Sequence, residues 1–268
     1  MAIAKKTYTR TVRVSRLSQQ DRQEMFEVFA SYYDNAFLET FERDLAEKEV
    51  VFLIRCAVSR KVVGFSTLKR YQVELEGEKA PVFFSGDTIV HKDYWGKNGL
   101  GLAFGRYLLR EKLKHPLRPV YWNLISKGYK TYLLLTNNFG TFYPRYDQPT
   151  PPRMQALIDA CGRTLYPENY NPASGVIEFA SKPGSVKDRL KGSVACIEEE
   201  HLKNPKIAFF QQRNPRWESG DELVCLGEFT LRMFLSVLLK KARKNLKGKK
   251  LPHAEGVVRD LPRLQFLK

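Results

Sequence analysis

The sequence contains few metal-binding or disulfide-forming residues. It has four cysteines and four histidines among 268 residues, and the cysteines lie far apart at positions 56, 161, 196 and 225. No C-x-x-C pair occurs, which argues against a zinc module and against a disulfide scaffold. We therefore expect no metal site and a reducing compartment.

Long hydrophobic runs are also lacking. The most apolar window, 231–239, is about half as long as a membrane-spanning helix and contains Arg232 and Ser236. The first residues have no apolar stretch with a small-residue cleavage site, which a secretory signal would need. We expect a cytoplasmic protein that does not span the membrane.

The chain has enough apolar residues to form a hydrophobic core, and it is strongly positively charged. Apolar residues make up 43% of the chain, and 45 Lys and Arg against 29 Asp and Glu give a formal net charge of +16. A charge of this size favours an anionic partner.

The basic segment 240–250 follows the apolar window, so the C-terminal region could touch the inner face of a membrane. It could equally be a docked helix with a solvated tail. Nucleic acid is an unlikely partner, because no nucleic-acid-binding motif is present.

Hydrophobic periodicity predicts an α/β chain. We expect helices over 18–33, 36–48 and 102–114 and strands over 50–58, 62–73, 81–90 and 120–125. Three consecutive strands without a helix between them predict an antiparallel meander. Further along, the pattern predicts a helix over 186–202, a strand over 206–212 and a long amphipathic helix over 223–244. We place a core domain at 1–180 and a helical C-terminal extension, with a basic tail, at 181–268.

A glycine-rich turn between a strand and a helix is the most informative motif. The strand ends at Val90, glycines follow at 96, 99 and 101, and the next helix begins directly after them. Glycines let the backbone approach a phosphate, and the N-terminus of a helix offers unpaired N–H groups to it. Lys97 adds a cation. Alternatively, the glycines only make a tight corner.

The order of these elements, together with the stretch from Ile89 to Gly101, resembles the GCN5-related N-acetyltransferase (GNAT) superfamily. In that family an Arg/Gln-x-x-Gly-x-Gly/Ala pattern after the fourth strand binds the pyrophosphate of an acyl-CoA. Here Gly96 stands where Arg or Gln is usual; if Trp95 is aligned there instead, Asn98 is an extra residue.

The resemblance implies a mixed, mostly antiparallel sheet flanked by helices and a thioester co-substrate without a metal. Donor binding would involve Ile89, Val90, Gly96, Lys97, Asn98, Gly99, Leu100 and Gly101. The tyrosine in the helix after the fifth strand often protonates the departing thiolate in this family. Tyr132 matches that position best, with Tyr129 as the alternative.

Acyl transfer to an amine also needs a base. Asp87 and His91 are the candidates on the long strand, and strict alternation would place both on the same face as Ser85. Asp87 could instead be a structural carboxylate and His91 a solvated loop residue.

Aromatic and cationic residues gather after this motif. Tyr129, Tyr143 and Arg145 could form an acceptor or acyl pocket, with Arg145 holding a carboxylate or phosphate. The same residues could simply form a rigid surface turn.

Taken together, the sequence predicts transfer of an acyl group from acyl-CoA or acyl carrier protein to an amine. Acyl carrier protein is acidic and carries a phosphopantetheine arm, which suits a basic partner. Two alternatives remain open. One is a catalytically silent GNAT fold that binds a membrane surface or an acidic carrier protein, and the other is altered chemistry such as thioester hydrolysis or decarboxylation.

Overall fold

A single mixed sheet organises the molecule. The computed structural model describes residues 6–95, 99–114, 116–179, 189–190, 196–233 and 235. Its nine-stranded sheet has the order β1-β3-β4-β5-β6-β11-β9-β8, with β7 also paired to β11. The strands are β1 (Thr7–Arg13), β3 (Val50–Cys56), β4 (Val62–Leu75), β5 (Glu78–Val90), β6 (Val120–Ser126), β7 (Phe142–Tyr143), β8 (Tyr170–Asn171), β9 (Val176–Ile177) and β11 (Glu222–Phe229). Only β5 and β6 run parallel among the described pairs, which confirms the predicted mostly antiparallel sheet.

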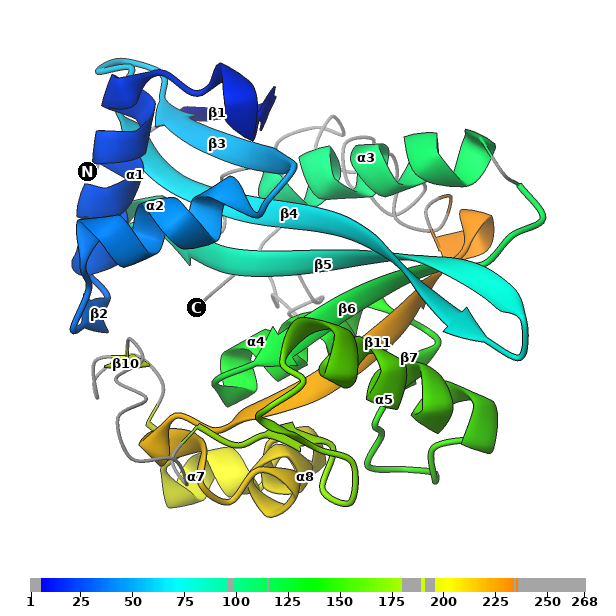
Figure 1. The fold of residues 1–268 in the computed structure, drawn as a ribbon. Helices are drawn as coiled ribbons and strands as arrows, with labels where there is room; N and C mark the ends of the chain where they lie inside the picture. The colour runs from blue at the N-terminus through cyan, green and yellow to red at the C-terminus, as the bar shows by residue number, and fades with distance from the viewer. Residues whose placement is uncertain are drawn as a thin grey trace, which may run out of the picture.

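Helices flank both faces of this sheet (Figure 1). The α-helices are α1 (Gln19–Ala30), α2 (Leu38–Ala46), α3 (Leu100–Lys114), α4 (Tyr129–Asn138), α5 (Pro152–Leu165), α7 (Glu199–Leu202) and α8 (Pro205–Arg213). Short 3-10 helices are η1 (Val14–Arg16), η2 (Lys92–Tyr94) and η3 (Trp217–Ser219). A separate two-stranded ladder joins β2 (Tyr33–Asp34) to β10 (Arg189–Leu190). None of the described helices is long and apolar enough to cross a membrane.

Strand β3 shows how the two faces are divided. Phe52 and Ile54 pack in the core cluster that contains residues of α3 and α4, whereas Val51 and Leu53 pack in the cluster of α1 and α2. This alternation is the expected side-chain period of a strand that is buried on both faces. A third cluster lies under α5, beside β6 and β11. Helices α1, α2 and α5 therefore share one face, and α3 and α4 the other.

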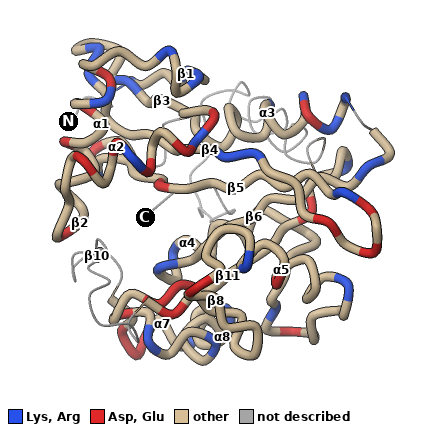
Figure 2. Tube along the Cα trace, in the orientation of Figure 1, with Lys and Arg blue, Asp and Glu red and all other residues tan. Residues whose placement is uncertain are grey.

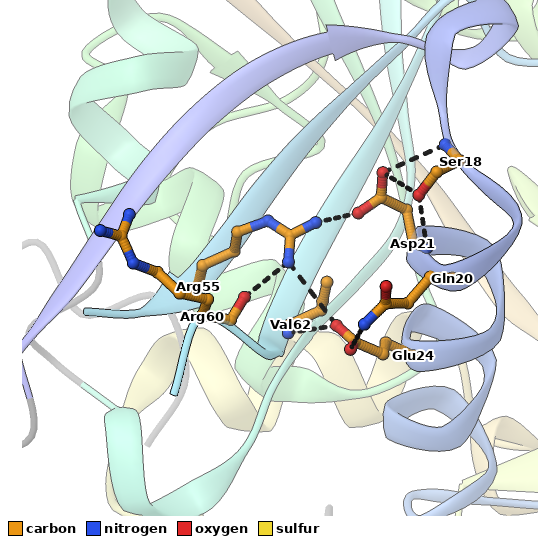
Figure 3. A network of polar contacts seen from close by, with 7 residues as sticks. All are labelled: Ser18, Gln20, Asp21, Glu24, Arg55, Arg60 and Val62. Carbon is orange, nitrogen blue, oxygen red and sulfur yellow. Dashed lines mark hydrogen bonds and ion pairs between the residues drawn. The ribbon is translucent and has the colours of Figure 1, made fainter. Parts of the chain in front are cut away.

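An ion-pair network fixes α1 to the turn between β3 and β4 (Figure 3). The helix begins with a capping box, in which Ser18 accepts from the backbone N–H of Asp21 and Asp21 accepts from that of Ser18. Arg55 pairs with Asp21 and lies 3.6 Å from a carboxylate oxygen of Glu24. Glu24 also accepts from the backbone N–H of Val62 at 2.8 Å. These contacts tie α1 to β3 and to the start of β4.

The C-terminal third differs from the prediction. Residues 205–213 form helix α8, where a strand over 206–212 is predicted, and 222–229 form strand β11, where the helix over 223–244 is predicted to begin. Residues 189–190 pair as a strand within the predicted helix 186–202. Because β11 lies between β6 and β9, the central sheet includes residues on both sides of position 180. The basic segment 240–250 lies outside the described residues.

Charges of both signs are interspersed over the described elements (Figure 2). Most of the net positive charge belongs to residues outside them, chiefly in the segment 240–250 and its C-terminal continuation.

Candidate functional site

The candidate site lies where β5 and β6 part. Their parallel pairing runs only from Val82 opposite Tyr121 to Ser85 opposite Leu124. Strand β5 continues to Val90 while paired to β4 alone, and β6 continues to Ser126 while paired to β11. Figure 1 shows the two strands diverging toward the end of the molecule that carries α1 and α2. Among the described residues, no strand pairs with the side of β5 that faces β6 beyond Ser85, and we call this stretch of backbone the open edge.

A β-bulge marks the point of parting. Between Ser66 and Leu68 of β4, the register of β5 advances from Thr88 to Ser85, so β5 has an extra residue at Gly86 and Asp87. A Cβ atom on Gly86 would come within 2.6 Å of Thr67 Oγ1, so this position accommodates only glycine without a shift. The bulge bends β5 away from β6 and changes which way its side chains point.

This bulge overturns the strict alternation expected for β5. Ser85 accepts a hydrogen bond from Trp122 Nε1 at 2.9 Å on the α3 face, and Thr88, also on that face, bonds Ser66 at 2.7 Å. Ser85 and Thr88 therefore share one face of the sheet although two residues, Gly86 and Asp87, lie between them. Asp87 lies in the bulge.

The ladder register decides which backbone groups face the open edge. His91 donates its backbone N–H to Val63 at 2.8 Å, and Gly64 pairs with Val90 in the same register. Hydrogen-bonded and non-hydrogen-bonded pairs alternate in an antiparallel ladder, so Ile89 directs its N–H and C=O to β4. Thr88 and Val90 direct theirs to the open edge. Of the two strand residues predicted to contact the donor, Val90 has its backbone groups on this side.

The carbonyl of Val90 already has a partner. Trp95 Nε1 donates to it at 2.6 Å, and the indole packs against the core cluster of the α3 face. Lys130 Nζ from α4 lies 6.0 Å from the centroid of the same ring. Trp95 therefore contacts both β5 and α4.

The glycine turn is described only from Gly99 onward. Gly99 has a φ of 69°, in the left-handed region that favours glycine, and Leu100 begins α3 directly after it. Thr9 Oγ1 of β1 lies 3.6 Å from where a Cβ of Gly99 would be. Gly101 is in the first turn of α3. The predicted phosphate contacts Gly96, Lys97 and Asn98 lie outside the described residues.

The charge of Asp87, in the bulge, acts on the ammonium group of Lys48. Burial lowers the pKa of Lys48, and the charge of Asp87 opposes that shift. Lys48 Nζ donates to the carbonyl of Asp44 at 3.0 Å and lies 5.9 Å from the ring centroid of Phe84. The carboxylate of Asp87 therefore belongs to the stretch of β5 that follows the end of its pairing with β6.

His91 lies just past the end of β5. Its Nδ1 accepts from the backbone N–H of Asp93 at 3.4 Å, and its side chain is 41% exposed. The ring meets that of Tyr94 edge-on at 6.1 Å between centroids. His91 is therefore available to solvent at the wide end of the parting strands.

Tyr132 is buried and bonded. Its hydroxyl donates to the carbonyl of Pro144 at 2.9 Å, its side chain is 0% exposed, and burial raises its pKa. A proton donor in this position would have to leave the Pro144 carbonyl first. The alternative, Tyr129, is also buried, and its ring lies 5.4 Å from that of His201.

The predicted substrate residue Arg145 already binds a carboxylate within the chain. Its Nε and Nη2 bond both oxygens of Asp147 at 2.7 and 2.6 Å, which raises the pKa of the guanidinium. The guanidinium also stacks on Phe142, 4.7 Å from the ring centroid. Tyr143 is buried in the α5 cluster and accepts from Gln148 at 3.4 Å.

The sequence analysis does not identify two buried polar groups that lie near the point where β5 and β6 diverge. Within the part of the chain that the structure describes, Thr67 Oγ1 and Asn123 Oδ1 have no hydrogen-bond partner. Thr67 lies opposite the bulge, and Asn123 pairs with Phe84 at the end of the β5–β6 ladder. Buried groups of this kind usually bind water or a ligand. A glycine inside a strand pattern, here Gly86, is the one signal that could have indicated the bulge.

Metal ligands are not grouped in this region or elsewhere in the described ranges. Among these described residues, no three His, Cys, Asp or Glu side chains lie close enough together to hold a metal ion.

No protein-family model and no curated protein matches the sequence. Among solved structures, the fold is similar to an Enterococcus faecalis protein described as a probable N-acyltransferase, at 15% identity and a TM-score of 0.37 over 48% of this chain and 31% of that one. Saccharomyces cerevisiae N-myristoyltransferase with bound myristoyl-CoA matches at 14% identity and a TM-score of 0.33, over 43% of this chain and 30% of the yeast enzyme.

An Escherichia coli GNAT family N-acetyltransferase in complex with CoA matches at 17% identity and a TM-score of 0.33, over 53% of this chain and 72% of the E. coli protein. The aligned region spans less than a third of the first two proteins. Scores this low assign no activity to the chain.

Proposed function

We propose that the protein transfers an acyl group from a CoA thioester to an amine. The observation that carries this proposal is the open edge of β5, where the backbone groups of Thr88 and Val90 face the parting from β6. An extended chain with amide groups can pair with such an edge as an additional strand would. The arm of CoA has this character, and α3 begins close by at Leu100 to receive its phosphates.

The residues at the parting support direct attack by the amine. A backbone N–H on the open edge can polarise the thioester carbonyl. Asp87 or His91 removes a proton from the ammonium group of the acceptor, and the neutral amine then attacks the thioester carbonyl to form the C–N bond. The C–S bond breaks, the nitrogen releases its second proton to solvent, and the departing thiolate takes a proton from Tyr132 or from solvent. Because Tyr132 is bonded to Pro144, its part in this step depends on a change of partner.

Acyl carrier protein is the alternative donor. Its phosphopantetheine arm would use the same edge as CoA, but the carrier would need a basic docking surface. The basic residues at 240–250 are the first candidates for that surface. Direct comparison of the two donors in one assay decides between them.

The test is a transfer assay with purified protein. Acetyl-, octanoyl- and palmitoyl-CoA are each incubated with a panel of primary amines, and the acylated amine is identified by mass spectrometry. We expect amine-dependent release of CoA together with the acyl-amine product. CoA released equally with and without amine would identify a thioesterase. Binding of CoA without any turnover would identify a silent binding module.

A further inference from the structure

The open edge of β5 carries a hydrogen bond that a bound donor would have to replace. Trp95 is five residues beyond Val90, and the short helix η2 turns its indole back so that Nε1 reaches the Val90 carbonyl at 2.6 Å. That carbonyl points away from β4, toward β6. The indole N–H thus binds the acceptor that an added strand, or an amide-containing ligand, would use.

The ring of Trp95 also occupies space between β5 and α4. It packs against the α3-face core, and Lys130 approaches it from α4. Burial lowers the pKa of Lys130, in keeping with its enclosed position. A chain passing along the open edge at Val90 would meet this ring first.

We propose that Trp95 competes with the donor's arm for the Val90 carbonyl. In the free protein the indole N–H holds the carbonyl, and the amide N–H of the pantetheine arm replaces it when CoA binds. This inference rests on the proposed function, because it takes CoA as the ligand of the open edge. Trp95 then lowers the donor affinity, since its indole occupies the side of the Val90 carbonyl at which the donor's amide would bind.

The cost of that exchange gives the size of the expected effect. A protein hydrogen bond contributes modestly once water is counted, so losing the competitor should tighten binding by about twofold to tenfold. Trp95→Phe removes the N–H donor and keeps an aromatic ring against the core. Trp217→Phe is the matched control, because Trp217 packs on the same core cluster but lies in η3, in a loop before β11.

The experiment measures CoA binding to the full chain by calorimetry. We expect Trp95→Phe to lower the Kd for CoA by about twofold to tenfold and Trp217→Phe to leave it unchanged. The nucleotide half of CoA, phosphoadenosine diphosphate, lacks the arm and should bind wild type and Trp95→Phe equally. A Kd for CoA that is unchanged or raised in Trp95→Phe would overturn the inference, as would equal tightening of the nucleotide half.

A second readout observes the indole itself. In ¹⁵N-labelled wild type, the side-chain N–H signal of Trp95 is assigned by its loss in Trp95→Phe, and saturating CoA should shift it more than the signals of Trp122 and Trp217. A Trp95 signal that stays in place while CoA binds contradicts the competition. If neither wild type nor Trp95→Phe binds CoA, the proposed function fails and the inference with it.

Discussion

At the scale of single residues, Asp87 is the proposed base. It is half-buried in the bulge of β5, where its charge acts on Lys48. Asp87→Asn should lower kcat by about a hundredfold or more if the carboxylate takes the amine proton, with the KM for acyl-CoA little changed.

Asp44→Asn is the matched control for that variant, because the charge of Asp44 also acts on Lys48 but its side chain is on the surface of α2. We expect its steady-state kinetics to equal those of wild type. Equal losses of kcat in both variants would mean that Asp87 acts only through the charge of Lys48.

Cys56 provides a prediction that depends on pH. Hydrogen bonds from Ser59, first of all, and from Val58 and Tyr94 lower the pKa of its thiol to about 6. At pH 7 the folded chain should therefore hold a Cys56 thiolate. Cys56 is only 7% exposed, so we expect iodoacetamide to label it slowly, with a labelling rate, followed by mass spectrometry, that inflects near pH 6. Cys161, whose pKa burial raises to about 12, should stay unlabelled in the folded protein.

The lowered pKa of Cys56 also makes the stability of the fold depend on pH. Because the folded pKa of Cys56 is below the unfolded value, the group stabilises the fold fully above the unfolded pKa, and this contribution is lost as the pH falls through about 6. Urea denaturation of wild type and Cys56→Ala should therefore show a difference that grows with pH across this range. A difference independent of pH would mean that Cys56 is a neutral thiol in the folded state.

At the scale of elements, the bulge in β5 is the feature on which the site depends. A side chain on Gly86 would meet Thr67 Oγ1 at 2.6 Å and Lys48 Cε at 2.9 Å. Gly86→Ala should therefore lower the free energy of unfolding by about 1–3 kcal/mol and reduce transfer activity, since β5 has to shift.

Gly140→Ala is the control, because nothing lies within 4 Å of an added Cβ there. Its unfolding free energy, measured by urea denaturation, should stay within about 0.5 kcal/mol of wild type. A Gly86→Ala protein as stable as Gly140→Ala would show that the bulge accepts a side chain.

Elements with clear periodicity and clear ends could be predicted from the sequence. Helix α3 was expected over 102–114 and spans Leu100–Lys114, because its apolar face and the prolines after it are local signals. The sequence does not predict strand β11, because this strand is buried on both faces and shows no two-residue alternation of apolar and polar side chains. Helix α8 was mistaken for a strand on its apolar run, although Asn204 as N-cap and Pro205 at the first helical position mark a helix start.

The geometry of the candidate site was less accessible to sequence reasoning. The bulge at Gly86 shifts the side chains of β5 out of strict alternation, and register is a property of strand pairing rather than of one strand. The bond from Trp95 to Val90 depends on the turn of η2, and the orphaned groups of Thr67 and Asn123 depend on packing between strands. No local pattern in the chain reports these contacts.

At the scale of the whole molecule, the basic C-terminal region is the element whose role stays a prediction. The segment 240–250 concentrates Lys and Arg after an apolar window. We propose that it binds anionic membranes peripherally, since each cation near an anionic surface contributes about 1 kcal/mol. Replacing Lys240, Lys241, Lys244 and Lys247 with Gln should abolish sedimentation with phosphatidylglycerol vesicles. Binding to neutral phosphatidylcholine vesicles is the control, and undiminished binding of the variant to anionic vesicles would refute the role.

In the central sheet, the strands β1, β3, β4 and β5 are joined to β6, β11, β9 and β8 by the short parallel ladder of β5 and β6 (Figure 1). The most direct test of the account is a map of backbone amide shifts on titration with CoA. We expect the largest shifts at Thr88, Val90, Gly99 and Gly101, on the open edge and at the start of α3. Shifts that cluster elsewhere, or that are absent at saturating CoA, would contradict it.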